Sequence, residues 1–549
     1  MLARLVGFGL LASNLAASSS CPQQPFQLPI KDVQVYPNVA NSFMTGIPAK
    51  IGTPSQDIVL LPWTELNNTW IYDQQVSCVK TVVRSDFLCD IRRGRPFDED
   101  KSTTFQKATD IVAAGGATVE ASYQGSERGI PKLIASGLGG TESFAPGGKD
   151  GLNDFPIGIP RLQWDHGYTT LHPLGLGSNS TYLNALRQAG RIGSRVFSIF
   201  WGRVWDDYPV DGALVVGGYD KEKTIGPNFT APLDYGDFGD PSGCWTGMKV
   251  HITDIQLNNL DGSDVSLLPS SANMPACIVP QRQSLMEVPR PLLHKFERVT
   301  RTKSNGTSSG LHWGAPIFSA DNVFEGDLTI VLSSGLKVRV PNTQFITPHL
   351  DMDRNGTRTL DDDQLDLVIT GIENQPATLG RYFLTSAYLM VNHDAKAFTL
   401  WQANPTTSSS LVPVLDEKTA KKCGNANGIT QSSMSRTPSD ASKPSGAVIG
   451  GAVAGGVVAA LLGLGTFFLI RRRRQNAGGE QASPDGGSAV SEHKLAQFTP
   501  GGAADAESWA QEMDGSPVTA TEMYSSNHEV YEMDADAYGH RAVPDDKEW

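Results

Sequence analysis

Two stretches of the chain hold the residues whose types and spacing bear most directly on chemistry. Trp63-Thr-Glu follows the apolar run Ile58-Val-Leu-Leu61, and Pro280-Gln-Arg follows Cys277-Ile-Val. Two carboxylates that share one proton can make a water molecule attack a peptide bond, because the ionised one takes a proton from the water while its protonated partner polarises the carbonyl. The first stretch supplies only Glu65, and the second supplies no carboxylate. Neither tryptophan nor proline can titrate, so the two stretches lack the groups for that reaction.

A second pattern concerns metal binding. Asp351-Met-Asp-Arg-Asn-Gly356 matches the start of a calcium-binding loop. The twelfth position is Asp362 where a bidentate Glu is usual, Arg358 stands at the usually apolar eighth position, and Asn355 begins a glycosylation sequon. The favoured interpretation is a solvent-exposed acidic loop, and we predict no metal and no other cofactor.

The elements that must position these residues are predicted to be β-strands. From Pro29 to Gly129, short runs rich in Val, Ile, Thr and Tyr are separated by Gly, Pro and Asn-Asn turn signals. The run that begins at Ile58 is continuously apolar, which predicts a strand buried on both faces. Residues 328–341 predict a hairpin that turns at Ser-Ser-Gly335. A short helix is predicted where apolar residues recur at helical spacing, at Tyr182, Leu183, Leu186 and Ile192.

The ends of the chain carry targeting signals. Residues 1–20 combine Arg4 with the apolar run Leu5–Ala12 and a small-residue end, which is typical of a signal peptide. Residues 446–470 carry no charge and are followed by Arg471-Arg-Arg-Arg474, which predicts a single membrane span with a cytoplasmic tail. Glycine spacing in this segment would allow two spans to pack as a homodimer, although glycine is also common in single spans.

Charge is distributed unevenly along the chain. The formal net charge is -13, and residues 475–549 hold 15 Asp and Glu against 3 Lys and Arg, or -12. The main body therefore carries about -1, which does not favour nucleic acid as a partner. The Gly-, Ser- and acid-rich tail is predicted to be disordered.

Sequons and cysteines predict that the main body lies in an extracellular or lumenal compartment. All the sequons precede residue 446: Asn67, Asn179, Asn228, Asn305 and Asn355. All the cysteines do so too: Cys21, Cys78, Cys89, Cys244, Cys277 and Cys423. An even number in an oxidising compartment predicts three disulfides, whose pairing the spacing leaves open. No Cys-x-x-Cys or His-rich spacing indicates a zinc site.

Further segments occur in an order that identifies a family. They are Ile51-Gly-Thr-Pro-Ser-Gln56, Leu174-Gly-Leu-Gly177, Phe197-Ser-Ile-Phe200, Asp211-Gly-Ala-Leu-Val-Val-Gly-Gly-Tyr-Asp220 and Thr378-Leu-Gly-Arg-Tyr-Phe-Leu384. Together they resemble the pepsin-like aspartic proteases of the fungal, membrane-anchored type, over roughly residues 29–403. That family is mostly β and bilobal, and each lobe contributes one catalytic Asp. The resemblance implies the same fold here, with a tight strand pair across residues 211–220.

The resemblance places degenerate residues at both catalytic positions. Trp63 and Pro280 stand where the family has its two Asp, while Glu65 and Arg282 replace the glycines two residues later. Tyr123 lies where the family has a flap tyrosine above the cleft, with an ordinary strand tyrosine as the alternative. We therefore predict no catalytic residues, a binding cleft lined by these five side chains, and an apolar floor where Trp63 and Pro280 face each other.

The resemblance also implies a disulfide pairing. Cys78 with Cys89 would close the small loop that follows the first motif, and Cys244 with Cys277 would join two strands of the second lobe. Cys21 would then pair with Cys423 and tie the ends of the ectodomain together. Arg381 stands where the family usually has an Asp.

The predicted organisation has six parts. These are a signal peptide at 1–20, an N-terminal lobe at 21–205, a C-terminal lobe at 206–405, a flexible Ser/Thr-rich spacer at 406–445, a transmembrane helix at 446–470 and a cytoplasmic tail at 471–549. The chain is thus predicted to be a type I single-pass glycoprotein, with the plasma membrane as its destination.

Three functional hypotheses remain open at this stage. The favoured one is an inactive homologue of an aspartic endopeptidase, a pseudopeptidase that binds a peptide or cell-wall-associated ligand or scaffolds a partner. An active membrane-tethered aspartic endopeptidase is the first alternative. A cell-surface stress or wall sensor that signals through the tail is the second, and it is compatible with the first hypothesis.

Overall fold

The computed structural model describes residues 24–424 apart from short internal gaps. These gaps are 76–77, 79–82, 84, 119–128, 149–150, 163, 165–170, 207, 236–243 and 374–375. The predictions for the signal peptide, Cys21, Tyr123, the span at 446–470 and the tail lie outside the described residues. Within the described part, no helix is long and apolar enough to cross a membrane. Contacts divide the chain into Met1–Ile429 and Thr430–Trp549, and all described residues belong to the first unit.

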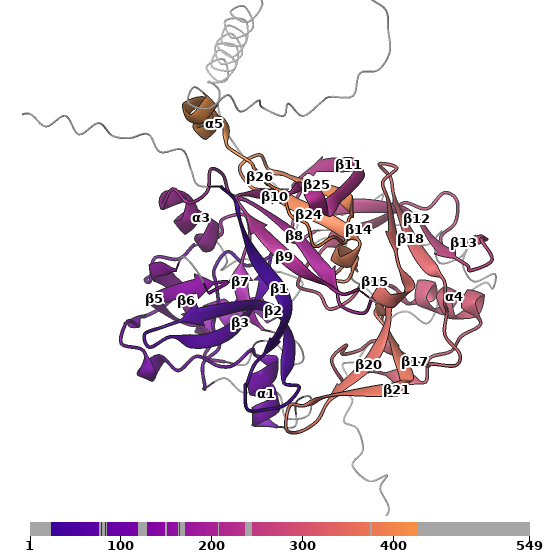
Figure 1. Cartoon of the computed structure of the whole chain (residues 1–549), viewed down its shortest axis with the longest axis horizontal. Helices are drawn as coiled ribbons and strands as arrows, with labels where there is room; N and C mark the ends of the chain where they lie inside the picture. The colour runs from indigo at the N-terminus through magenta and orange to yellow at the C-terminus, as the bar shows by residue number, and fades with distance from the viewer. Residues whose placement is uncertain are drawn as a thin grey trace, which may run out of the picture. The chain divides into compact units, whose positions relative to one another are not determined.

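The described chain is mostly β-strand, as predicted (Figure 1). Its largest sheet has twelve strands. They are β1 (Phe26–Gln34), β2 (Phe43–Ile51), β3 (Gln56–Trp63), β4 (Gln106–Ala108), β5 (Leu138–Pro146), β6 (Leu152–Ile159), β7 (His172–Gly175), β8 (Val196–Arg203), β9 (Val210–Val216), β11 (Thr224–Pro232), β24 (Ala387–Asn392) and β25 (Ala397–Ala403). The main path runs β11-β25-β24-β8-β9-β1-β2-β3-β7, with β5 branching from β2 to carry β4 and β6.

The predicted boundary at residues 205 and 206 does not separate two sheets. Strand β24 pairs with β8 so that Leu389 lies opposite Ile199, and β9 continues the same sheet on the other side of β8. These strands are almost entirely buried, because their apolar side chains are covered on both faces. Strands from the beginning, middle and end of the chain therefore share one sheet.

The remaining strands form three smaller sheets. An eight-stranded sheet contains β12 (Lys249–Asn258), β13 (Asp264–Ser266), β14 (Met274–Ile278), β15 (Met286–Pro289), β18 (Asp327–Leu332), β19 (Lys337–Val340), β22 (Ile369–Ile372) and β23 (Ala377–Leu379). A four-stranded sheet contains β16 (Gly306–Thr307), β17 (Pro316–Ser319), β20 (Ile346–Met352) and β21 (Arg358–Leu367). A two-stranded sheet contains β10 (Gly218–Asp220) and β26 (Leu411–Pro413). The predicted hairpin is confirmed as β18–β19, and Gly335 at its turn has a φ of 85°.

Helices lie mostly at the periphery of the sheets (Figure 1). They are α1 (Asp86–Arg92), α2 (Ile130–Ser136), α3 (Thr181–Gln188), α4 (Arg290–Thr300) and α5 (Glu417–Gly424), with short turns of 3-10 helix at η1 (Glu99–Lys101), η3 (Lys221–Lys223), η4 (Asn342–Gln344) and η5 (Phe383–Thr385). Helix α3 confirms the predicted helix at Tyr182, Leu183 and Leu186, but it ends at Gln188, so Ile192 lies outside it. Its N-terminus is capped by Ser180, which accepts a hydrogen bond from the Leu183 N–H, and its apolar side chains are buried.

The predicted strand pair across residues 211–220 is wrong. Strands β9 and β10 follow each other, but β9 pairs with β1 and β8, whereas β10 pairs with β26. Gly217 redirects the chain between them with a φ of 82°. A Cβ on Gly218 would lie 2.1 Å from the Val412 carbonyl oxygen, so glycine permits the close approach of β26.

The predicted spacer also begins too early. The short apolar run Leu411-Val-Pro413 forms β26, and α5 follows it. The Lys223 ammonium donates to the Thr406 carbonyl, and Ser194 donates to the Val414 carbonyl. The segment from 406 to 424 therefore contacts the main body, where the backbone of β26 pairs with the edge of β10.

Two of the disulfides implied by the resemblance are present. Cys78 is bonded to Cys89 on α1, with an S–S distance of 2.02 Å. Cys244 is bonded to Cys277 on β14, with an S–S distance of 2.03 Å. Cys423 on α5 is also disulfide-bonded, and its expected partner Cys21 lies outside the described residues.

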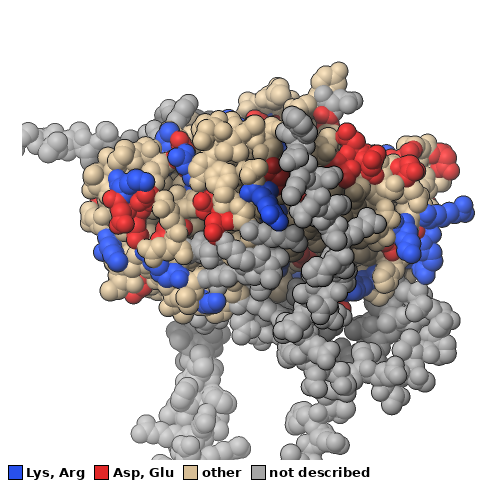
Figure 2. All heavy atoms as spheres, turned by 90° about the horizontal axis from the view of Figure 1, so that it is seen from below, with Lys and Arg blue, Asp and Glu red and all other residues tan. Residues whose placement is uncertain are grey.

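Surface charge is mixed on the face shown in Figure 2. Acidic and basic side chains of the described residues are interspersed over one half of this face, and at the opposite end acidic groups along the upper edge lie above a group of basic ones. This mixture agrees with the near-neutral charge of the sequence before residue 475.

Candidate functional site

The first candidate motif begins at the buried end of β3. This strand pairs with β2 on one side and runs parallel to β7 on the other, so that Trp63 lies opposite Gly175. The following loop crosses over that glycine, and a Cβ on Gly175 would lie 2.4 Å from the Asn68 carbonyl oxygen. Glycine is therefore required at this crossing.

The second candidate motif has the same local arrangement. Strand β14 runs parallel to β23 with Ile278 opposite Leu379, and the Val279 N–H donates to the Leu379 carbonyl at 2.8 Å. The loop after Pro280 crosses over Gly380, where a Cβ would lie 2.3 Å from the Ser284 carbonyl oxygen. Each motif thus leaves a buried strand, and its loop crosses a Leu-Gly step at the end of a parallel neighbour.

The two motifs meet through a buried hydrogen bond. The Thr64 hydroxyl donates to the Gln281 side-chain carbonyl at 3.1 Å, and the Thr64 N–H approaches the same oxygen at 3.4 Å. Both residues are buried, and 217 positions separate them in the sequence. The groups that join the motifs are a hydroxyl and an amide, neither of which exchanges protons as an acid or base in the physiological pH range.

The degenerate residues lie in apolar surroundings. Trp63 is 3% exposed and packs against Trp164, with 5.6 Å between ring centroids and an angle of 60° between the ring planes. Its Nε1 has no hydrogen-bond partner among the described residues. Pro280 is buried as well, and it brings no N–H to the loop. The Trp63–Trp164 pair makes this end of β3 apolar.

The charged residues predicted for the site have separate environments. Glu65 is buried at 4% exposure beside Thr64. Arg282 is half-buried, and its Nε lies 3.8 Å from a carboxylate oxygen of Glu287. The same Glu287 oxygen accepts a hydrogen bond from Thr378 at 2.8 Å. Glu287 was not predicted as a site residue, because it belongs to no catalytic motif that can be recognised in the sequence.

Arg381 stabilises the loop of the second motif by hydrogen bonds to its backbone. Its Nη2 donates to the Gln281 carbonyl at 2.7 Å, its Nε donates to the Arg282 carbonyl at 3.3 Å, and its guanidinium lies 5.0 Å from the centre of the Trp201 ring. Burial lowers the pKa of Arg381 to about 10, which still leaves it protonated at neutral pH. No sequence signal pointed to this supporting role.

Replacing Arg381 with Ala is expected to lower the free energy of unfolding by about 2–4 kcal/mol, because the change leaves a cavity and an unpaired Gln281 carbonyl. Chemical denaturation measures this loss. Arg381→Lys is the matched control: it keeps the charge but not the planar pair of donors, and it should recover only part of the stability. If Arg381→Ala were as stable as the wild-type chain, the supporting role would be wrong.

A second polar cluster was not predicted from the sequence. The fully buried Asp366 bonds to His312 Nδ1 at 2.9 Å and to His349 Nδ1 at 2.7 Å, and His312 Nε2 lies 2.8 Å from the Tyr382 hydroxyl. Burial raises the pKa of Tyr382 to about 12. The cluster connects β20 and β21 to the residue beside Arg381, so it holds the support of the second motif in place.

The calcium-like segment is a β-hairpin. One carboxylate oxygen of Asp353 accepts hydrogen bonds from the Asn355 and Thr357 N–H groups, both at 2.8 Å. The side chain of Arg358, at the start of β21, extends to β1 and donates to a carboxylate oxygen of Asp32 at 2.8 Å. The described residues contain no group of three or more His, Cys, Asp or Glu placed to hold a metal ion.

One predicted glycosylation site has a buried side chain. Asn67 is 7% exposed, and its side-chain oxygen accepts a hydrogen bond from the Asn179 N–H at 2.8 Å. Burial of this side chain opposes the attachment of a glycan. The sequon pattern contains no information about burial, so sequence alone could not separate this site from the exposed Asn228, Asn305 and Asn355.

Three cavities in the described part lie away from Trp63 and Pro280. They have volumes of about 560, 110 and 800 Å³, and their walls come from residues 26–191. Neither Trp63 nor Pro280 lines any of these three. The predicted cleft residue Tyr123 lies outside the described residues.

Comparison with known proteins adds no relative. No family model matches the chain, and no curated protein matches it. A functional assignment must therefore be argued from the residues and contacts described above.

Proposed function

We propose that the chain is a membrane-anchored, pepsin-like glycoprotein that has lost peptidase chemistry and binds a peptide or cell-wall-associated ligand, or scaffolds a partner. The observation that carries this proposal is the repeated arrangement around Trp63 and Pro280. A strand, a crossing loop and a Leu-Gly step occur twice, and the two copies meet at Thr64 and Gln281. Such a repeat is what two lobes of one ancestral unit would leave.

The chemistry at the junction supports binding over catalysis. Trp63 and Pro280 occupy the positions from which a pepsin-like enzyme would activate water, and both side chains are apolar and buried. Arg381 holds the second loop by charge-assisted hydrogen bonds, and the Asp366 cluster reaches Tyr382, the residue beside Arg381. A loop that is held this firmly without an acid or base suits a fixed recognition surface.

The membrane anchor is a separate part of the proposal. Residues 446–470 and the four arginines after them favour a type I span, which would place the described residues outside the plasma membrane. The exposed sequons Asn228, Asn305 and Asn355 fit that side of the membrane. In this arrangement residues 425–445 would serve as the spacer, and the acidic tail would be available for a sensor role inside the cell.

A cleavage assay tests the loss of activity. The full chain, purified in detergent, is incubated with an unbiased peptide library from acid to neutral pH, with and without a pepstatin-type inhibitor. We expect no inhibitor-sensitive cleavage, because neither motif position can hold the proton-sharing pair. Inhibitor-sensitive turnover would favour the active endopeptidase instead.

Binding is tested on the same preparation. Peptides and cell-wall polysaccharides are screened against the wild-type chain and against Arg282→Ala, which changes a half-buried residue of the second motif. A ligand that binds the wild-type chain and is weakened by Arg282→Ala would place recognition at the motif junction. Ligand binding that Arg282→Ala leaves unchanged would locate recognition elsewhere.

A further inference from the structure

A groove of about 800 Å³ lies along α3, outside the motif junction. Its other walls are the start of β6 and the loop at residues 114–117. The charged side chains among its lining residues are Asp154 and Arg191, one of each sign. The rest of the lining is neutral, and it includes the amides of Asn153, Asn184 and Gln188. Neutral amides suit a ligand that is rich in hydroxyl groups and has no charge.

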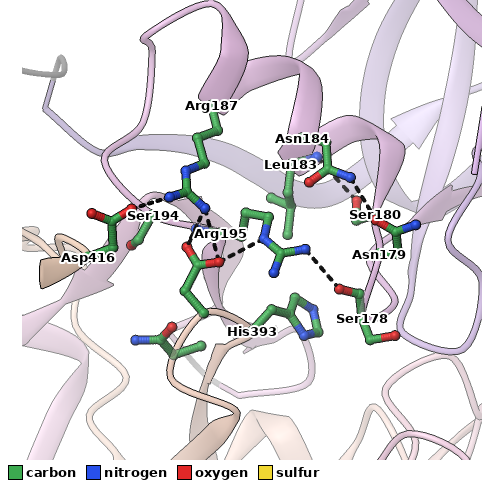
Figure 3. A network of polar contacts seen from close by, with 12 residues as sticks. Ser178, Asn179, Ser180, Leu183, Asn184, Arg187, Ser194, Arg195, His393 and Asp416 are labelled. Atoms are coloured by element: carbon green, nitrogen blue, oxygen red, sulfur yellow. Dashed lines mark hydrogen bonds and ion pairs between the residues drawn. The ribbon is translucent and has the colours of Figure 1, made fainter. Parts of the chain in front are cut away.

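Asn179 stands in the wall of this groove and is held in a defined orientation. Its side-chain oxygen accepts a hydrogen bond from Asn184 Nδ2 at 3.0 Å, and the two side chains lie next to each other at the start of α3 (Figure 3). Its backbone N–H donates to Asn67 Oδ1 at 2.8 Å. Among the described residues its Nδ2, the atom that carries a glycan in a sequon, makes no hydrogen bond.

The loop after Trp63 builds both sides of the groove. Asn68 accepts a hydrogen bond from the Ala117 N–H at 2.9 Å and another from the Thr181 hydroxyl at 2.6 Å. Asn68 Nδ2 also donates to the Ala117 carbonyl at 3.0 Å. These bonds fix the distance between the loop at 114–117 and the N-terminus of α3. The two walls of the groove are therefore held in place by side-chain hydrogen bonds.

An open strand edge lies opposite Asn179. In the described residues β6 pairs with β5, and its other edge is bridged at Gly158 by Trp70. The start of that edge, at Leu152, Asn153 and Asp154, has no strand partner among the described residues and lines the groove. An uncovered strand edge invites pairing with another chain. On α3, Asn184 and Gln188 are four residues apart and therefore lie on one face, leading away from Asn179.

We propose that this groove holds the chain's own glycan: the oligosaccharide on Asn179 lies along α3 and covers the free edge of β6. The occupant is identified by the sequon in the wall of the groove, by the unengaged Nδ2 and by the neutral lining. The neighbouring Asn67 cannot supply the glycan, because its side chain is buried and holds the Asn179 backbone. Glycans on Asn228, Asn305 and Asn355 stand on exposed positions and serve as internal references.

The rate of enzymatic deglycosylation tests this proposal at each site. The full chain is produced in a eukaryotic host and treated with peptide-N-glycosidase, once native and once denatured, and release is followed by mass spectrometry in heavy-oxygen water. We expect Asn179 to carry a glycan. The enzyme should release this glycan from the native chain about tenfold more slowly than the glycans at the reference sites, which corresponds to a free energy of about 1.4 kcal/mol for the contact between glycan and groove. Denaturation should make the rates equal. An unmodified Asn179, or equal native rates, would overturn the proposal.

Hydrogen exchange tests the covering of β6 independently. Asn179→Gln is expected to raise the exchange of backbone amides at residues 152–155, whereas the control Asn228→Gln, on exposed β11, should leave them unchanged. If Asn179→Gln folded with unchanged exchange in β6, the glycan would not lie on that edge. If the variant failed to fold, the deglycosylation rates of the wild-type chain would still decide the question.

Discussion

Lowering the pH from about 7 to about 4 is expected to destabilise the described domain by several kcal/mol, through two buried histidines. The first is His172 on β7, which is fully buried. Its Nδ1 accepts a hydrogen bond from the Tyr72 N–H at 2.9 Å, so Nε2 carries the proton and donates to the Arg95 carbonyl at 3.0 Å. Burial lowers its pKa to about 4. A second proton would place two donors face to face at Nδ1, so the fold holds the neutral ring.

The second histidine connects distant parts of the chain. His393 follows β24, is 8% exposed, and donates from Nε2 to the Leu176 carbonyl at 2.9 Å. Burial lowers its pKa to about 4, and the nearby Arg195 acts in the same direction. Arg195 is held beside it by Asp394 at 2.8 Å, in the network around α3 (Figure 3).

The direction of the pH effect follows from these lowered pKa values. An unfolded histidine binds a proton below about pH 6.5, whereas both native rings stay neutral until about pH 4. Between about pH 6.5 and about pH 4 the unfolded state therefore binds more protons than the native state. The stabilisation from the neutral histidines is fully present above about pH 6.5 and is lost as the pH falls toward about 4. A shift of this size corresponds to about 3 kcal/mol for each histidine.

Urea denaturation at a series of pH values measures this loss. The matched control is His172→Gln, which keeps an amide donor and acceptor but cannot titrate. It should start less stable at neutral pH and show a shallower dependence between about pH 6.5 and about pH 4. A wild-type chain whose stability does not change across that window would contradict the prediction.

Restoring a single aspartate at the first motif is expected to weaken the fold without creating activity. Trp63→Asp removes a buried ring that packs against Trp164 and leaves a cavity, a change that costs about 3–5 kcal/mol when a large aromatic is truncated. The new carboxylate is buried beside apolar groups, which raises the cost of its ionised form. It also lacks a partner at Pro280 to share its proton.

The variant should therefore become less stable as the pH rises above about 4, because its folded carboxylate resists ionisation and the unfolded one does not. This is the opposite trend to that of the two histidines, so the difference between Trp63→Asp and Trp63→Leu isolates the effect of the charge. The cleavage assay should detect no turnover for either variant. Turnover by Trp63→Asp alone would show that another carboxylate serves as its partner.

Local sequence features determined much of the secondary structure and part of the site. The apolar run at Ile58 became a strand buried on both faces, and the spacing of Tyr182, Leu183 and Leu186 became α3. Ser-Ser-Gly335 became a hairpin turn. These features depend on residues a few positions apart, where periodicity and turn chemistry act directly. The absence of a carboxylate at Trp63 and Pro280 was likewise visible in the sequence.

Only the tertiary structure decided how these pieces meet. Thr64 and Gln281 bond across 217 positions, and Asp366 collects two imidazoles from separate segments. The separation of β9 from β10 depends on which partner strands lie nearby. Asn67 and Asn179 have the same sequon pattern, but one is buried and holds the backbone of the other. Burial and pairing are set by long-range contacts, which a local pattern does not contain.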